Sequence, residues 1–282
     1  MINTTVNRYA YATVYPSDKI KVRAIDYDQD IEYEYNEDFA YGSKTDLALG
    51  IIDHFRNNGY LKTGVEVVVH ADSPPGSGLG TSSTIAVALI AALLKYCNKP
   101  IDKHELASKA YQIERVELGQ SGGRQDQYAA AFGGFNFMEF CEKKTQVHPL
   151  SIDKDVLKEL HYRMVFAYAG GMRHSYDIIK EQQDNYRTVE NVVEAHHYLK
   201  EISVKMRDAL LVGEIDDFSL LCNDAWHAKK KLASGITSSR INSIYDAAIS
   251  AGAKGGKLSG AGGGGFMFFL CEPEKRSEVQ RV

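Results

Sequence analysis

The sequence lacks several features that mark specialised classes of protein. Its four cysteines (Cys97, Cys141, Cys222 and Cys271) form no CxxC pair, which disfavours a metal site and predicts reduced, mostly buried thiols in a cytosolic protein. The longest apolar run, Ile85 to Leu94, is too short to cross a bilayer, and no signal peptide opens the chain. Lys and Arg are scattered, and the net charge of −4 does not suggest a nucleic-acid surface. We therefore expect a soluble, cytoplasmic protein with no nucleic-acid or membrane partner.

The composition favours a folded protein with a sizeable core, because 44% of the 282 residues are hydrophobic. A polar connector between Leu150 and His161 predicts two domains, 1–155 and 156–282. Alternating aromatic or β-branched and polar residues predict antiparallel strands over 3–14, 20–25 and 30–35. Apolar periodicity predicts helices over 41–57, 82–96, 102–118, 176–183, 189–212, 218–232 and 240–250.

A glycine-rich loop follows a β-branched run and precedes an apolar helix, and it reads Pro-Pro-Gly-Ser-Gly-Leu-Gly-Thr-Ser-Ser over 74–83. Its three glycines allow positive φ angles and close approach of the backbone to a ligand. The N-terminal amides of the next helix favour an anion, so the loop predicts a phosphate site. It is neither a Walker A loop nor a dinucleotide fingerprint, because the closing Gly-Lys-Ser/Thr and the required glycine spacing are missing. A capped turn without a ligand is the alternative.

Two acidic residues are candidates for chemistry. Asp102 and Glu105 form a capping box for a helix that ends at Gly119, and Glu114 lies in its inward-facing stripe, although a solvated edge position is the alternative. Asp126 precedes a short Ala-rich segment, where local rules make it a helix N-cap.

A second glycine cluster reads Lys-Leu-Ser-Gly-Ala-Gly-Gly-Gly-Gly-Phe over 257–266 and connects a helix to an apolar strand. Such a cluster would be a poor choice for stability alone, and it indicates backbone that passes beside a ligand. A flexible loop is the alternative. Arg173 follows Gly170 and Gly171, and it could pair with a surface carboxylate or recognise a phosphate or sugar.

The 74–83 loop, the Asp126 segment (122–134) and the 257–266 cluster together resemble motifs of the GHMP small-molecule kinases, which include galactokinase, homoserine kinase and mevalonate kinase. The run Gly-Gly-Phe-Asn-Phe-Met-Glu-Phe, with Val-His-Pro-Leu after it, is similar to bacterial sugar 1-kinases that act on D-glycero-D-manno-heptose 7-phosphate. Two departures stand out. Ala169 stands where the heptose kinases usually carry the Thr of a Tyr-Thr-Gly-x-x-Arg pattern. No segment matches the family's first motif, and the family continues past Val282, so we expect the sequence to be trimmed at both ends.

The resemblance implies an α+β fold with a ribosomal-protein-S5-like N-terminal domain, a left-handed crossover and a ferredoxin-like C-terminal domain, with the active site between them. It implies transfer of the γ-phosphate of ATP to the C1 hydroxyl of a sugar phosphate. A fucose or galactose kinase, or an inactive nucleotide-binding regulator, is the alternative. A homodimer is possible.

The resemblance also implies roles for individual residues. Ser82 and Glu114 would hold Mg²⁺, whose hard charge prefers oxygen ligands, and Asp126 would accept the proton of the attacking hydroxyl. Arg173 and the glycine cluster would lie near the substrate, the latter through Gly260, Ala261, Gly262 and Gly263. The implied ATP contacts are Pro75, Gly76, Ser77, Gly78, Leu79, Gly80, Thr81, Ser82 and Ser83.

Overall fold

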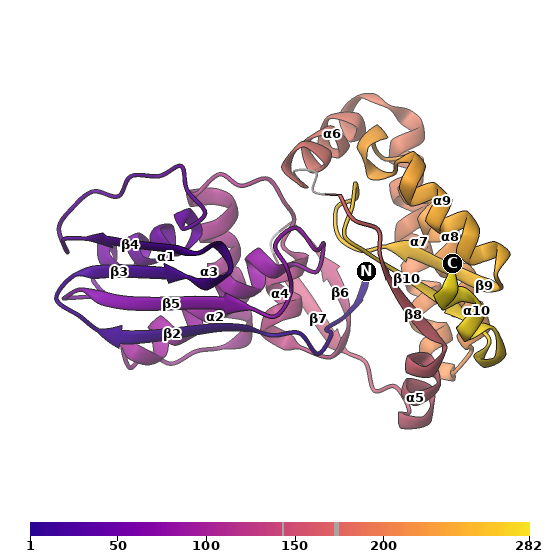
Figure 1. The fold of residues 1–282 in the computed structure, drawn as a ribbon, viewed down its shortest axis with the longest axis horizontal. Helices are drawn as coiled ribbons and strands as arrows, with labels where there is room; N and C mark the ends of the chain where they lie inside the picture. Colours follow the sequence, from indigo (N-terminus) through magenta and orange to yellow (C-terminus); the bar gives the residue numbers. More distant parts are fainter. Residues whose placement is uncertain (143, 172–174) are drawn as a thin grey trace. The chain divides into compact units, whose positions relative to one another are not determined.

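The computed structural model describes residues 1–142, 144–171 and 175–282, which form two compact units (Figure 1). The N-terminal unit comprises 5–75 and 80–134, and the C-terminal unit comprises 1–4, 76–79 and 135–282. The chain passes from one unit to the other four times, the last time between Gly134 and Phe135. The boundary between two domains at residue 155 stays a prediction.

The N-terminal unit is built on a sheet with the strand order β2-β5-β3-β4, in which β3 and β5 are parallel and the other neighbours antiparallel. Its strands are β2 (Ala10–Pro16), β3 (Ile20–Ala24), β4 (Gln29–Tyr33) and β5 (Val65–Ala71). Its helices are η1 (Ile25–Tyr27), α1 (Asp46–Asn57), α2 (Thr81–Tyr96), α3 (Lys103–Tyr111), the π-helical η2 (Gln112–Glu117) and α4 (Gln125–Phe132).

One face of this sheet forms the core of the unit. Alternate residues of β5 are buried, as expected for a strand with one covered face. Val67 of β5, Val22 of β3 and Leu89 of α2 belong to one fully buried cluster. The burial predicted for the apolar helix is confirmed along this side of α2, whereas Ser82 at its start is exposed.

The C-terminal unit contains, in its described residues, the antiparallel sheets β1-β6-β7 and β8-β10-β9. Their strands are β1 (Ile2–Thr4), β6 (Phe135–Phe140), β7 (Thr145–Pro149), β8 (Met164–Tyr168), β9 (Ala253–Leu258) and β10 (Phe266–Cys271). The helices are α5 (Lys154–Arg163), α6 (Ser175–Thr188), α7 (Glu190–Val212), α8 (Ile215–Lys229), η3 (Ser234–Ile236), α9 (Ser239–Ser250), η4 (Pro273–Lys275) and α10 (Arg276–Arg281). The expected mixture of helices and strands is confirmed.

Two predicted elements are wrong. The strand expected over 3–14 is two strands, because β1 pairs with β6 and β2 pairs with β5, with exposed residues between them. The polar connector near residue 155 contains helix α5. The carboxylate of Asp153 accepts the Asp155 amide at 2.7 Å and caps this helix, and Leu160 anchors it in the core.

The cysteines only partly follow the prediction of buried thiols. Cys222 and Cys271 are buried, Cys97 is partly buried and Cys141 is exposed. Burial raises the pKa of Cys222 to about 12, so its thiol stays protonated at neutral pH and packs as a small apolar side chain.

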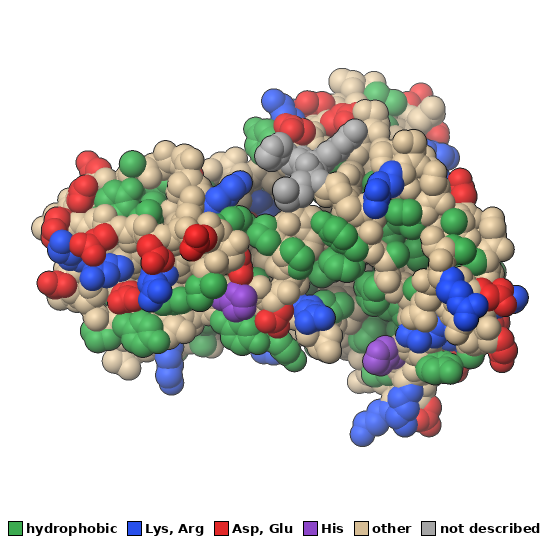
Figure 2. Space-filling model, in the orientation of Figure 1, with side chains coloured by type: hydrophobic (Ala, Val, Ile, Leu, Met, Phe, Trp, Pro, Cys, Tyr) green, Lys and Arg blue, Asp and Glu red, His purple; other side chains and the backbone are tan. Residues whose placement is uncertain are grey.

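The surface mixes charges of both signs, and Figure 2 shows acidic and basic side chains interspersed over the N-terminal unit. On its sheet, Lys21 of β3 lies 3.3 Å from Glu32 of β4, and Arg23 lies 3.4 Å from Asp30. Such exposed pairs contribute little to stability. Among the described residues, no helix has both the length and the apolar character needed to cross a membrane.

A glycine in β9 allows α8 to pack against this strand, and its replacement tests the packing. A Cβ atom on Gly255 would overlap the carbonyl oxygen of Ser219 in α8. We expect Gly255→Ala to lower the free energy of unfolding by about 1–3 kcal/mol, the usual cost of overpacking. Gly123→Ala is the matched control, because a Cβ atom there would meet no heavy atom within 4 Å. Equal urea midpoints for the two variants would contradict this close packing.

Candidate functional site

The glycine-rich loop has the backbone conformation that its sequence predicts. Gly76, Gly78 and Gly80 have φ angles of +75°, +75° and +72°, a region that favours glycine. Residues Gly76–Leu79 belong to the C-terminal unit, and Gly80 is the N-cap of α2 in the N-terminal unit. Because Gly80 has no side chain to cap the helix, the positive end of α2 suits a bound anion. The individual ATP contacts stay a prediction.

The second glycine cluster lies directly against the first half of this loop. A Cβ atom on Gly260 would lie 2.7 Å from the oxygen of Gly78, and one on Gly78 would lie 3.2 Å from the oxygen of Ser259. The amide of Phe266 donates to the oxygen of Ser77 at 3.1 Å. Close approach of two backbone segments therefore accounts for several of these glycines, in addition to any ligand.

Side chains and backbone groups of the C-terminal unit fix this cluster. Lys229 donates to the carbonyl oxygen of Gly260, and Gln182 donates to that of Ala261 at 3.3 Å. The amide of Gly263 donates to the oxygen of Ile236 at 2.9 Å. Substrate contact by Gly260, Ala261, Gly262 and Gly263 stays a prediction. Arg173 lies outside the described residues.

Glu114 is the centre of a buried polar cluster in the N-terminal unit and has no exposed surface. Its Oε1 accepts the Ser82 hydroxyl at 3.0 Å and lies 3.4 Å from the Arg115 guanidinium. Its Oε2 accepts the Ser83 hydroxyl at 2.8 Å and the Gln127 amide at 2.6 Å. Three hydrogen bonds and the ion pair with Arg115 thus offset part of the desolvation cost of this carboxylate, and the solvated-edge alternative for Glu114 is wrong.

A π-helical turn positions Glu114. The predicted cap of this helix is confirmed, because the Asp102 carboxylate accepts the amides of His104 at 2.8 Å and Glu105 at 3.2 Å. After α3 the helix continues as η2, in which the amide of Leu118 donates to the oxygen of Ile113. Such i→i+5 turns are rare and occur frequently at functional sites.

The position of Asp126 differs from the prediction. The N-cap of α4 is Arg124, and Asp126 lies inside the first helical turn, where the helix dipole favours a carboxylate. A Cβ atom on Gly80 would lie 3.1 Å from Cγ of Asp126. The Asp126 carboxylate therefore sits against the start of α2, beside the loop residue that caps this helix.

The oxygen atoms of Ser82 and Glu114 suit a magnesium ion. Mg²⁺ binds oxygen at 2.0–2.1 Å in octahedral geometry, so two neighbouring ligands lie about 2.9 Å apart. The Ser82 Oγ and Glu114 Oε1 atoms are 3.0 Å apart. The described residues contain no cluster of three or more His, Cys, Asp or Glu side chains.

Three residues of the cluster had no predicted role in holding Glu114. The sequence predicts only an ATP contact for Ser83 and no role for Arg115 or Gln127. Arg115 also donates to the Ser83 hydroxyl at 3.2 Å and to the Ser121 oxygen at 3.3 Å. The only local signal was that Arg115 and Gln127 directly follow the two acidic candidates in the chain.

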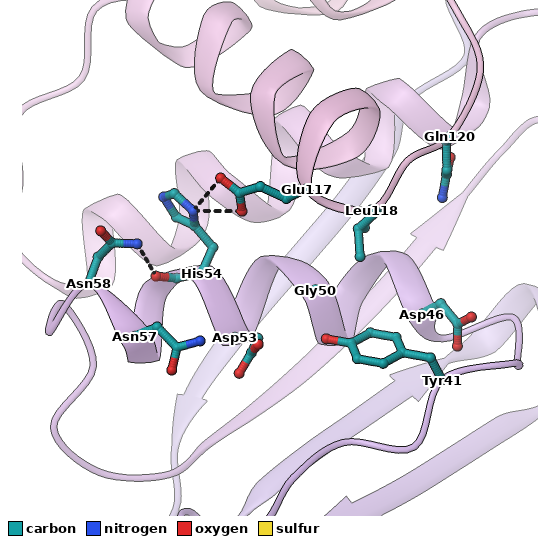
Figure 3. A pocket seen from close by; sticks show the side chains of 10 residues that line it. All are labelled: Tyr41, Asp46, Gly50, Asp53, His54, Asn57, Asn58, Glu117, Leu118 and Gln120. Carbon is teal, nitrogen blue, oxygen red and sulfur yellow. Dashed lines mark hydrogen bonds and ion pairs between the residues drawn. The ribbon is translucent and has the colours of Figure 1, made fainter.

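A separate pocket of about 570 Å³ lies between α1 and the end of η2 (Figure 3). His54 and Glu117 both line it and contact each other, with the His54 Nδ1 atom 3.0 Å from Glu117 Oε2. Burial, and secondarily the charge of Asp53, raise the pKa of Tyr41 in its wall. No residue of the Glu114 cluster lines this pocket.

Comparison with known proteins assigns the chain to a family. It matches the models of the GHMP kinases N terminal domain over residues 46–134 and the GHMP kinases C terminal domain over 206–282. A D-glycero-alpha-D-manno-heptose 7-phosphate kinase of Campylobacter jejuni is 36% identical over 98% of this chain and 82% of that protein. The crystal structure of a D-glycero-D-manno-heptose 1-phosphate kinase from Bacteroides thetaiotaomicron superposes with a TM-score of 0.81 at 33% identity, covering 100% of this chain and 82% of that one.

A bifunctional fucokinase/GDP-fucose pyrophosphorylase of Arabidopsis thaliana is 27% identical over 88% of this chain and 24% of that longer protein. The two family models lie in order along one chain, and the heptose kinases match it over nearly its full length. The chain belongs to the GHMP kinase family.

Proposed function

We propose that this protein transfers the γ-phosphoryl group of ATP to the anomeric C1 hydroxyl of a heptose 7-phosphate. In this reaction the C1 oxygen forms a bond to the γ-phosphorus, the bond from that phosphorus to the β–γ bridging oxygen breaks, and ADP leaves. The hydroxyl proton passes to a carboxylate of the protein. Full-length similarity to a heptose 7-phosphate kinase supports this choice of sugar.

The observation that carries the proposal is the buried Glu114 cluster at the start of α2. Ser82, Ser83 and Gln127 hold the Glu114 carboxylate in a fully buried position, where apolar side chains of similar volume would often be as stable or more stable. It fits a reaction in which negative charge accumulates on phosphate oxygens and must be neutralised. A bound Mg²⁺ would supply that neutralisation, and Ser82 and Glu114 would hold it.

The remaining residues would bind and orient the reactants. Gly76–Ser83 would hold the ATP phosphates on backbone amides at the N-terminus of α2. Asp126, packed against Gly80, would accept the C1 hydroxyl proton as general base. The glycine cluster at Gly260–Gly263 would lie against the phosphates and the sugar.

A panel of acceptors tests the proposed reaction. We expect ADP release to be fastest with D-glycero-D-manno-heptose 7-phosphate, and ³¹P NMR of the product should show a new phosphate on the anomeric carbon. Faster turnover of fucose or galactose would favour the alternative sugar kinases, to which similarity to the fucokinase points. Calorimetric binding of ATP without turnover of any acceptor would favour a nucleotide-binding regulator. The panel should be run on the longest natural form of the protein.

A further inference from the structure

Gln127 presents an unexplained buried polar atom beside the proposed metal ligands. Its side chain has no exposed surface, and its Nε2 donates to Glu114 Oε2 at 2.6 Å. The orientation of this amide is fixed, because a carboxylate can only accept and the nitrogen must therefore face it. The Oε1 atom can only accept, so the carboxylate cannot satisfy it, and among the described residues it has no hydrogen-bond partner.

Leaving this oxygen without a hydrogen-bond partner lowers the stability of the fold. A buried acceptor without a partner destabilises a fold by about 1–3 kcal/mol, and an apolar side chain of the same length would avoid this. Because Oε1 and Nε2 share one carbon atom, the unpaired oxygen lies beside the Glu114 carboxylate. The cluster therefore contains one acceptor for which the described part of the chain supplies no donor.

We infer that Gln127 is a positioning residue for the metal site, an inference that rests on the proposed function. Its amide nitrogen holds Glu114 in place, and its carbonyl oxygen accepts a hydrogen bond from a water molecule in the ion's coordination shell. Mg²⁺ gives up its waters reluctantly and usually keeps several of them. Outer partners of this kind orient the ligands of a metal, and their loss typically costs 10- to 100-fold in metal affinity or activity.

Ser83 provides a matched comparison, because its hydroxyl donates to the same Glu114 Oε2 at 2.8 Å from a buried position. Ser83→Ala removes one donor to this oxygen and leaves the Gln127 carbonyl in place. Gln127→Met keeps the length of the side chain but removes both the donor and the unpaired acceptor. If Gln127→Met weakens metal binding more than Ser83→Ala does, the difference reflects the loss of the Gln127 carbonyl oxygen.

The experiment measures Mn²⁺ binding by the EPR signal of the free ion, in the presence of a non-hydrolysable ATP analogue. We expect Gln127→Met to raise the Mn²⁺ dissociation constant by about 10-fold or more, and Ser83→Ala to raise it clearly less. Melting curves without metal separate stability from binding. Gln127→Asn, which is one methylene shorter, should act in the same direction and serves if Gln127→Met does not fold.

Each outcome decides the inference. Unchanged Mn²⁺ affinity in folded Gln127→Met, with only a lower melting temperature, would mean a purely structural role and overturn it. Equal weakening by Ser83→Ala and Gln127→Met would mean that Gln127 acts only through Glu114, which would overturn the role of its carbonyl. Failure of the parent protein to bind Mn²⁺ with the analogue would instead remove the proposed metal site, and the inference with it.

Discussion

Replacing Asp126 with Asn is expected to lower kcat by about 10²- to 10⁴-fold, the usual contribution of a general base, while the protein stays folded. Asn has nearly the same shape, so the contact of this side chain with Gly80 is kept. Asp126 lies in the first turn of α4, so loss of its charge should reduce stability by only about 0.3–1 kcal/mol through the helix dipole. The measurement pairs kcat, at saturating heptose 7-phosphate, with a melting curve.

A control for the loss of a first-turn carboxylate is available in α5. Asp155 occupies the first turn of that helix, and its side chain is 87% exposed. Asp155→Asn should reproduce a small dipole effect on stability and leave kcat at the parental value. Near-parental turnover by folded Asp126→Asn would show that Asp126 only stabilises the start of α4.

Replacing Glu114 with Gln should have two large effects, one on stability and one on activity. The carboxylate accepts hydrogen bonds on both oxygens, whereas an amide can accept on only one, and Arg115 would lose its buried counter-charge. Removing one partner of a buried ion pair typically costs about 3–5 kcal/mol, which urea unfolding would measure.

The activity of Glu114→Gln at limiting Mg²⁺ should fall by about 100-fold or more, because metal stabilisation of the transition state is worth several kcal/mol. ATP binding measured without metal should change far less. Glu117→Gln is the control from the same turn, since Glu117 is 38% exposed and pairs with His54 in the separate pocket; its effect should be small. Superimposable Mg²⁺ titrations of Glu114→Gln and the parent would reduce Glu114 to a structural role.

The sequence by itself determined the elements whose signals are local. The N-cap at Asp102, the helix stop at Gly119 and the positive φ angles of Gly76, Gly78 and Gly80 are all present as expected. Each depends on the backbone preferences of a few neighbouring residues, and these preferences do not depend on tertiary contacts. Local rules gave Glu114 and Asp126 only a place in a helix stripe and at a helix start, whereas their proposed chemical roles came from the resemblance to GHMP kinase motifs.

Local signals failed where a neighbour distant in sequence decided the outcome. The run 3–14 alternates like one strand, but its two ends pair with β6 and β5 in different units. Asp126 resembles an N-cap, yet α4 begins earlier, at Gln125. The glycine cluster still predicts a ligand loop, but its contact with the backbone of Ser77 and Gly78, which also requires glycine, could not be read from local signals.

The partners of Glu114 were decided only by the tertiary structure. Ser83 lies 31 residues before Glu114 and Gln127 lies 13 residues after it, and no periodicity links such positions. Their contact depends on how α2, η2 and α4 pack, and on the π-helical turn that directs Glu114 inward. A buried carboxylate requires hydrogen-bond donors from the segments that surround it. The packing of these segments decides which residues donate, because the sequence alone shows only which side chains are able to donate.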